Sequence, residues 1–414
     1  MKKLIALSVA LALVASAGAS IDDALDHVSD SLRFSTHDSS IALKTSGTLD
    51  LEAYRIPELS NDLIYTEGRS LFAPRMAVFL DAQIGPRIYF FSQARIDRGF
   101  DPSDDPLEAR LDEYALRLTV AKSPYTTIQV GKFGTVFGNW MVRHGSWENP
   151  FITAPLAYGR LTGLWDNTPP FNTTTLLRWS HVIPSPTSQA DDKYFSVPVI
   201  WGPSYASGAS LSTELGPINF AAEIKNTSLS SRPETWSVTH TGFQNPTFTG
   251  RLGYHPNPTW HFGLSWSSGT FLDAAAHPPL RAGARLSDYK ETVFGGDIAF
   301  AWRHWQVWAE AISTKFAIPG VADPHVFSWY VESKYKFTAR IFGALRVGQQ
   351  TYSKIPDATG GAIRWDRDVT AIDFAPTFRL AAHLQAKLQY SLQREEGDPK
   401  HWSHLTAAQM TLRF

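Results

Sequence analysis

Apolar and polar residues alternate with a period of two along much of this chain. The clearest run places Ala382, Leu384, Ala386, Leu388, Tyr390 and Leu392 on one side and His383, Gln385, Lys387, Gln389, Ser391 and Gln393 on the other. Successive side chains of a β-strand point to opposite faces, so this pattern predicts a strand with one apolar and one polar face. Each such run is about 10 to 13 residues long, which is the length that a tilted strand needs to cross a bilayer.

The alternation predicts sixteen strands. They are expected at 41–54, 71–84, 87–98, 111–121, 126–133, 206–215, 218–227, 245–255, 259–270, 289–302, 304–315, 325–336, 339–351, 365–379, 382–394 and 402–414. An even number lets the last strand pair with the first, which closes an antiparallel barrel. An eighteen-strand alternative adds 173–183 and 193–201. Sixteen is preferred because Pro184, Pro186 and Pro198 interrupt those segments, and proline removes a backbone donor from the ladder.

The connections alternate between short and long. Short turns at Gly216-Pro217, Asn257-Pro258, the Arg303-His304 junction and the Phe337-Thr338 junction are followed by long polar segments at 228–243, 271–288, 316–324, 352–363 and 395–401. Outer-membrane barrels have short periplasmic turns and long extracellular loops. The alternative, a soluble β-sandwich, would have shorter strands and no such regular asymmetry.

The longest connection, 134–205, has about 70 residues, a length that indicates a functional element or an insertion. It is rich in large aromatic side chains: Trp140, Trp147, Phe151, Tyr158 and Trp165. Such side chains favour burial, so we expect the loop to fold back into the barrel lumen. An external lid or a set of subunit contacts is the alternative.

The sequence at both chain ends predicts particular elements. Residues 1–19 have Lys2 and Lys3, an apolar run and an A-x-A pattern, which predict a secretory signal peptide cleaved after Ala19. Ile21, Leu25, Val28 and Leu32 recur at helical spacing within the periplasmic segment 20–40, which favours a short helix there; a segment that narrows the lumen or a flexible tail are alternatives. The last predicted strand ends on Phe414 itself.

The signal peptide, the alternating strands and the terminal aromatic residue resemble those of a Gram-negative outer-membrane porin. The run "TTIQVGKFGTVFG" is loosely similar to porins of the phosphate-selective O/P type, although no multi-lysine selectivity ladder is visible. The resemblance implies a bacterial outer-membrane location, a homotrimer and a role for Phe414 in barrel insertion. We expect Phe414, Trp302 and Trp305 to lie in the aromatic belt at the lipid interface.

The polar face of the predicted strands carries many charges. Its cations are Arg75, Arg95, Arg117, Lys225, Arg251, Lys334, Lys336, Arg340, Arg346, Arg379, Lys387 and Arg413, and its acids are Asp81, Asp97, Glu113, Glu223, Glu291, Asp297, Glu310, Glu332 and Asp373. A packed core could not hold so many charges, whereas a water-filled lumen of sixteen strands can. The slight cationic excess predicts a mild anion preference, with Arg143, His144 and Arg160 of the long loop as candidate constriction cations. For any one residue, pairing across strands within the wall is the simpler role.

Other function classes find little support. The chain has no cysteine, and its net charge of -1 is unlike that of a nucleic-acid-binding domain. No nucleophile-elbow or H-E-x-x-H motif is present, so we predict no catalytic residues, metal or cofactor. The preferred interpretation is a porin for passive diffusion of small hydrophilic solutes or ions. The alternatives are a barrel sheath for a partner such as a multihaem cytochrome and, less favoured, an outer-membrane barrel hydrolase.

Overall fold

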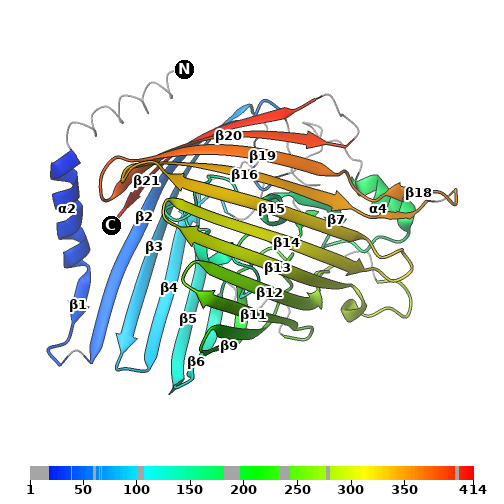
Figure 1. The fold of residues 1–414 in the computed structure, drawn as a ribbon. Coiled ribbons are helices and arrows are strands. Elements are labelled where there is room, and N and C mark those ends of the chain that lie inside the picture. The colour runs from blue at the N-terminus through cyan, green and yellow to red at the C-terminus, as the bar shows by residue number, and fades with distance from the viewer. Residues whose placement is uncertain are drawn as a thin grey trace.

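The chain folds into a closed antiparallel β-barrel of sixteen long strands (Figure 1). This computed structural model describes residues 18–38, 40–58, 62–64, 66, 68–99, 107–180, 196–233, 243–276, 280–357, 359–396 and 401–414. The barrel strands are β2 (Ile41–Arg55), β3 (Ser70–Ile84), β4 (Ile88–Asp97), β5 (Glu108–Lys122), β6 (Tyr125–Phe133), β9 (Ala206–Leu215), β10 (Ile218–Lys225), β11 (Thr247–Asn257), β12 (Trp260–Thr270), β13 (Lys290–Trp302), β14 (Trp305–Ala317), β15 (His325–Lys336), β16 (Ile341–Tyr352), β19 (Val369–Arg379), β20 (Leu384–Glu395) and β21 (Ser403–Arg413).

The predicted strand count is confirmed. Neighbouring strands pair in chain order, and β2 pairs with β21 from Thr48↔Arg413 to Arg55↔Thr406, which closes the sheet. The extra pair of an eighteen-strand barrel does not form in the described residues of these segments: Thr173–Ser180 is a helix, α4, and within 196–201 the strand β8 is Ser196–Pro198. β8 pairs instead with β7 (Leu161–Trp165) inside the long connection between β6 and β9.

The period of two appears directly in the exposure of the strands. On β16, Phe342, Ala344 and Arg346 are buried, whereas Leu345 between them is exposed. The same holds on β15, where Glu332 is buried and Val331 is exposed. The charged side chains Arg346 and Glu332 therefore point into the barrel, and the apolar Leu345 and Val331 lie on its outer surface, the arrangement of a strand that meets lipid on one face.

Short turns gather at one end of the barrel and long connections at the other. The positive φ angles of Gly85, Gly216 and Arg303 lie in these short turns. At the same end, the helix α2 (Gly18–Ser31) and the short strand β1 (Arg33–Ser35) form an N-terminal extension (Figure 1). Among the described residues, no helix combines the length and apolar character needed to span a membrane.

The N-terminal extension continues the barrel wall. β1 pairs with residues 42–44 of β2, beyond the point where β21 ends. Asp22 of α2 accepts hydrogen bonds from the backbone N–H groups of Ala382 and His383, and Asp26 contacts His383 Nε2 at 2.9 Å. Residues 1–17, most of the expected signal peptide, lie outside the described residues, so cleavage after Ala19 stays a prediction.

An apolar core lies inside the barrel toward its long-loop end, which differs from the expectation of a lumen filled with water throughout. Trp140, Leu164 and Val199 of the long connection pack with Phe271 and Trp365 of two other loops. Inward side chains of the wall complete this core, among them Val293, Ile312, Phe316, Val326 and Tyr330. Alternation within strands could not reveal this, because the core is built mainly from loop residues.

Candidate pore and its constriction

The described part of the long connection, 134–180 and 196–205, lies against the inner wall of the barrel, where wall carboxylates bind its first turns. Glu223 of β10 accepts hydrogen bonds from Thr135 Oγ1 (2.7 Å) and Val136 N (3.2 Å). Glu310 of β14 accepts from the backbone N–H groups of Asn139 and Trp140 and from Tyr158 OH (2.7 Å). Buried main-chain donors need such partners, because an unsatisfied one costs about 1–3 kcal/mol.

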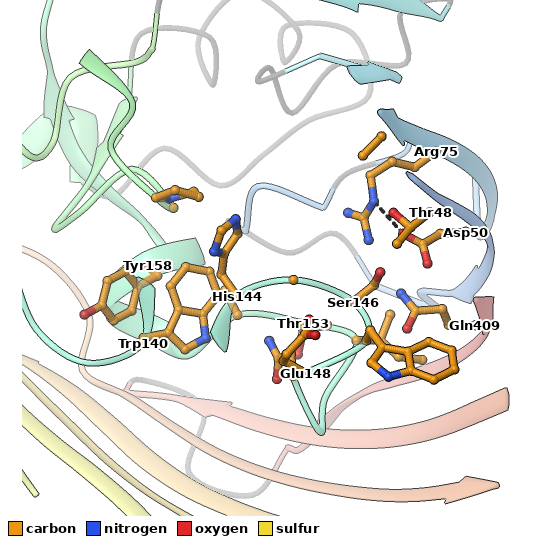
Figure 2. A pocket seen from close by; sticks show the side chains of 18 of the residues that line it. Thr48, Asp50, Arg75, Trp140, His144, Ser146, Glu148, Thr153, Tyr158 and Gln409 are labelled. Atoms are coloured by element: carbon orange, nitrogen blue, oxygen red, sulfur yellow. Dashed lines mark hydrogen bonds and ion pairs between the residues drawn. The ribbon is translucent and has the colours of Figure 1, made fainter. Parts of the chain in front are cut away.

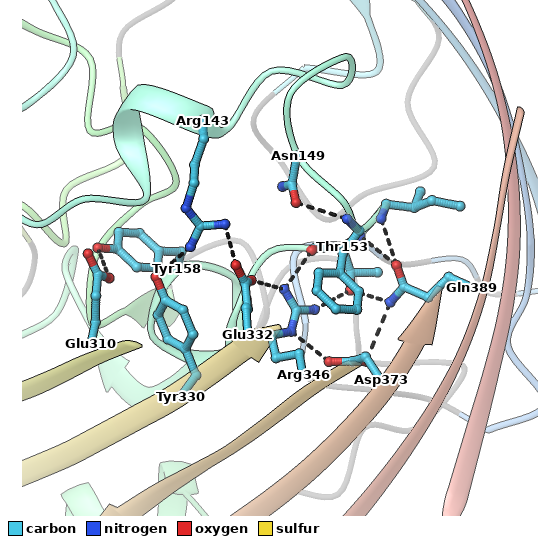
Figure 3. Close-up of polar contacts among 12 residues, drawn as sticks. Arg143, Asn149, Thr153, Tyr158, Glu310, Tyr330, Glu332, Arg346, Asp373 and Gln389 are labelled. Atoms are coloured by element: carbon cyan, nitrogen blue, oxygen red, sulfur yellow. Dashed lines mark hydrogen bonds and ion pairs between the residues drawn. The ribbon is translucent and has the colours of Figure 1, made fainter. Parts of the chain in front are cut away.

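A second anchor is a buried network of charges on β15, β16 and β19 (Figure 3). Arg143, in the short 3-10 helix Met141–Arg143, pairs with Glu332 and donates to Tyr330 OH at 3.1 Å. Arg346 bridges Glu332 and Asp373 with contacts of 3.2 and 2.7 Å. It also donates to Thr153 O at 3.0 Å, so the same guanidinium joins the wall to the loop. Removing one member would leave a buried charge without its partner.

β20 supplies the third anchor. Lys387 Nζ donates to the carbonyl oxygens of Ser146 and Asn149, the latter at 2.6 Å. Gln389 Oε1 accepts from Ile152 N at 2.6 Å, and Gln385 Nε2 donates to Ser146 O at 3.0 Å. The expected inward folding of the loop therefore agrees with its contacts, which reach wall strands from β10 to β20.

The anchored loop leaves a cavity of about 870 Å³ between itself and the opposite wall (Figure 2). β2 and β3 contribute Asp50 and Arg75 to its lining, and the loop contributes Trp140, His144 and Glu148. Arg75 pairs with Asp50 at 3.1 Å, and Arg95 of β4 pairs with Asp112 at 3.0 Å. Both arginines remain partly exposed to the cavity, so they present charge to it while their carboxylate partners are buried.

Two of the three candidate constriction cations are buried and paired with carboxylates. Arg143 is 6% exposed and pairs with Glu332. Arg160 is 3% exposed, pairs with Glu395 and lies 3.9 Å from Asp62. Burial by itself lowers the pKa of Arg160, but these carboxylates raise it overall, so its charge is fixed. Arg160 borders the 870 Å³ cavity with its charge paired, and Arg143 joins the loop to the wall through Glu332. Their role at a constriction stays a prediction.

His144 does line the cavity, but not as a cation. Its Nδ1 lies 2.6 Å from Met141 O, and its Nε2 lies 3.0 Å from Tyr205 OH. Burial, and then the nearby cations Arg95 and Arg75, lower the pKa of His144 to about 4. The imidazole is thus neutral near pH 7, which corrects the expected charge.

The remaining candidate residues separate into three groups. Arg75, Arg95 and Arg346 border the cavity, and Arg346 and Lys387 are buried in the loop anchors. Arg117 donates to Gln129 Oε1 (2.8 Å) and borders a second cavity of about 450 Å³. Lys334, Lys336 and Arg340 lie at or near the turn between β15 and β16, at the short-turn end. The sequence placed Gln385 and Gln389 on the polar face, but it gave no sign of their contacts with the loop.

The expected interface residues lie at the short-turn end. Trp302 and Trp305 face each other across the turn between β13 and β14, and they are 51% and 45% exposed. Phe414 exchanges two backbone hydrogen bonds with Gly47, each of 3.0 Å. The last residue of the chain thus contributes to barrel closure.

No family model and no curated protein sequence matches the chain. Solved structures do match. The outer membrane channel DcaP of Acinetobacter baumannii has a TM-score of 0.55 and 11% identity, over 92% of this chain and 99% of that one. A loop L8 deletion mutant of OmpT, an outer membrane protein of Vibrio cholerae, has a TM-score of 0.55 and 10% identity, over 91% and 100%. An anion-selective porin from Comamonas acidovorans has a TM-score of 0.50 and 10% identity, over 90% and 99%. At such identities the likeness shows the fold alone, that of an outer-membrane porin barrel.

Proposed function

We propose that this protein is an outer-membrane porin through which small hydrophilic solutes cross by passive diffusion. The observation that carries the proposal is the charged cavity of about 870 Å³ that remains between the anchored loop and the wall of β2 to β5, inside a barrel whose outer face is apolar. The barrel fold shared with outer-membrane channels supports the same function and location. No chemical reaction is part of the proposal.

We further propose a mild preference for anions. Wall carboxylates such as Glu223, Glu310 and Glu332 are buried and bound to the loop, so they contribute little negative charge to the open lumen. Several wall cations, among them Arg75 and Arg95, remain partly exposed. Wall acids that are bound to the loop and wall cations that stay accessible together favour anions. Glu148 of the loop is exposed at the cavity and acts against this preference, which is why we propose a mild one.

Export, assembly and subtype belong to the same proposal. We propose that the chain is exported with a signal peptide cleaved near Ala19 and forms a homotrimer in the membrane; a structure of the Vibrio OmpT protein is described as a trimer form. The likeness to the phosphate-selective O/P type gains no support from Lys132 of the G-K-F run. That lysine is 1% exposed and donates to Leu111 O at 2.9 Å, so it is not placed to meet a solute.

A sheath for a cytochrome is less well supported than a pore. The loop and its apolar core occupy the part of the lumen in which a partner protein would have to lie. A hydrolase is likewise not favoured, because His144 contacts a carbonyl oxygen and a tyrosine hydroxyl rather than a serine.

Recording from purified protein in planar bilayers under a salt gradient tests the proposal. We expect stepwise conductance and a reversal potential of the sign given by excess chloride permeability. A protein that inserts without conducting would contradict the channel. A reversal potential of the opposite sign would contradict the anion preference and leave the channel intact.

A further inference from the structure

Cationic and aromatic side chains alternate across the inner wall at the short-turn end. Lys334 Nζ lies 4.5 Å from the ring centre of Phe342, and Arg379 Cζ lies 5.9 Å from the same ring. Arg379 Cζ is also 5.3 Å from the ring centre of Trp147, and Arg413 Cζ is 4.1 Å from it. We call Lys334, Phe342, Arg379, Trp147 and Arg413 the basic-aromatic ladder.

The loop anchors hold Trp147 in this ladder. Gln385 Nε2 donates to the carbonyl oxygens of Ser146 and Trp147, and Lys387 binds Ser146 O. The indole is thus fixed through its own main chain rather than through side-chain hydrogen bonds. Trp147 and Arg413 both line the 870 Å³ cavity, so this part of the ladder meets a solute that occupies the cavity.

The cations of the ladder differ from the other arginines of the wall in their partners. Arg75, Arg95, Arg251 and Arg346 each pair with a carboxylate. Among the described residues, the side chains of Lys334, Arg379 and Arg413 have aromatic rings as neighbours but no hydrogen bond or ion pair, and Arg379 Nε is buried without an acceptor. A ring face stabilises a cation without neutralising it or using its N–H groups. The N–H donors of the ladder are therefore available. Glu148, which lines the same cavity, acts electrostatically on Lys334 and Arg413 without forming an ion pair with either.

We propose that the basic-aromatic ladder is a binding subsite for flat organic anions, namely aromatic monocarboxylates. This inference rests on the proposed porin function and names a class of solute for it. The planar fork of a guanidinium binds a carboxylate through two hydrogen bonds, and its flat face stacks on a ring. An aromatic carboxylate uses both features: its oxygens meet the free donors, and its ring extends the stack of Trp147 and Arg413. Chloride and acetate can use only the charge and the donors.

Titration calorimetry on the folded protein in detergent tests the subsite directly, with benzoate, cyclohexanecarboxylate, acetate and inorganic phosphate as probes. We expect benzoate to bind at least tenfold more tightly than cyclohexanecarboxylate, which has the same charge but no flat ring. Equal affinities for these two acids would overturn the proposal. Phosphate binding as tight as that of benzoate would also overturn it, because the site would then be a general oxyanion site.

Three variants locate the binding. Arg379→Gln together with Arg413→Gln should weaken benzoate binding at least tenfold, whereas Lys122→Gln, which removes an exposed cation at the same end of the barrel, should not change it. Trp147→Leu should abolish the preference for benzoate over cyclohexanecarboxylate while acetate binding stays unchanged. The loop anchors of residue 147 are main-chain contacts, so this variant keeps them. Unchanged benzoate affinity in the double variant would place the site elsewhere and overturn the proposal.

Bilayer recording separates this inference from the porin function on which it rests. In a conducting channel, benzoate should reduce the chloride current of the wild type and of Lys122→Gln, but not that of the double variant. Conductance without any effect of benzoate would overturn the subsite and leave the porin. Benzoate binding by a protein that never conducts would overturn the porin function while the subsite stands.

Discussion

At the scale of single residues, the decisive contacts join side chains on the polar face of a strand to loop residues far away in the sequence. Glu310 and Asn139 are 171 positions apart, and Glu332 and Arg143 are 189 apart. Alternation predicted that both glutamates face inward, which the structure bears out. It could not predict their partners, because a period of two gives the direction of a side chain and not what it meets. Arg143 and His144 lie in the long loop, where alternation does not apply, so neither their direction nor their partners could be predicted.

Gly138 shows how closely the loop approaches the wall. Its φ of +70° lies in the left-handed region, and a Cβ added there would lie 2.7 Å from both Glu310 Oε1 and Tyr158 OH. Gly85 has a similar φ of +59° with open space around it. We expect Gly138→Ala to lower the free energy of unfolding by about 1–3 kcal/mol more than Gly85→Ala does, because only the first adds a steric clash to the backbone strain. Urea unfolding of both variants measures the two free energies of unfolding. Equal losses of stability would mean that Glu310 moves away from the added Cβ at no energetic cost.

The neutral His144 predicts a dependence of stability on pH. Its folded pKa of about 4 lies below the unfolded value near 6.5, so between these values the unfolded chain binds a proton that the folded chain does not. Acidification through this window therefore favours unfolding, by up to about 3 kcal/mol, and less where water in the cavity screens the ring. We expect His144→Gln to reduce the loss of stability between pH 7 and pH 4.5, measured as the shift in the urea midpoint. The control His37→Gln changes an exposed imidazole and should show the same loss as the wild type. A His144 variant with the wild-type loss would show that His144 does not cause it.

At the scale of elements, the strands were predictable and the interior of the long loop was not. Each strand has one face suited to lipid and one polar face. Its alternation can therefore be recognised from the residues of that strand alone. The helices α3 (Leu156–Gly159) and α4 and the antiparallel pairing of β7 with β8 have no such local cause. Leu156, Leu164 and Val197 are buried against the wall and other loops, so tertiary contacts decide their conformation. The aromatic content of the loop indicated that the loop is buried, but it did not predict the helices and strands within it.

The anchoring of the long loop can be tested at Glu332. Glu332→Gln removes the negative charge shared by Arg143 and Arg346, which leaves two buried guanidinium groups with less compensation. We expect a loss of about 3–5 kcal/mol in the free energy of unfolding. We also expect larger and noisier single-channel currents, because the loop would leave its place against β15.

Asp288→Asn serves as the control for Glu332, since it removes a negative charge from the exposed loop before β13. The asparagine Oδ1 can still accept the hydrogen bond that Asp288 accepts from Arg285 N at 2.8 Å. This variant should leave both stability and current unchanged. A Glu332 variant with wild-type current noise would show that the other anchors, on β10, β14 and β20, suffice to hold the loop.

At the scale of the whole molecule, stability depends on closure between the first and last strands, which no segment of the sequence reveals alone. Hydrocarbon offers no partner for backbone donors and acceptors, so a sheet within a bilayer must have no free edge. Here the edge of β2 is covered by β21, then by Phe414 at Gly47, and finally by β1. The sequence predicted the role of Phe414 in the last strand, but not that of β1, because a three-residue strand is too short to show alternation.

The contact of Phe414 with Gly47 makes closure testable by a double-mutant cycle. A Cβ added at Gly47 would lie 2.9 Å from Phe414 Cε1 and 2.8 Å from Ala77 O. We therefore expect Gly47→Ala to destabilise the folded barrel by about 1–3 kcal/mol through overpacking. In a Phe414→Ala background the ring is gone and only the Ala77 contact remains, so Gly47→Ala should cost less there. Unfolding of the four proteins from lipid vesicles measures the coupling between the two sites. Strictly additive losses would mean that the terminal ring does not rest on Gly47, and closure would then depend on the backbone hydrogen bonds of Phe414 alone.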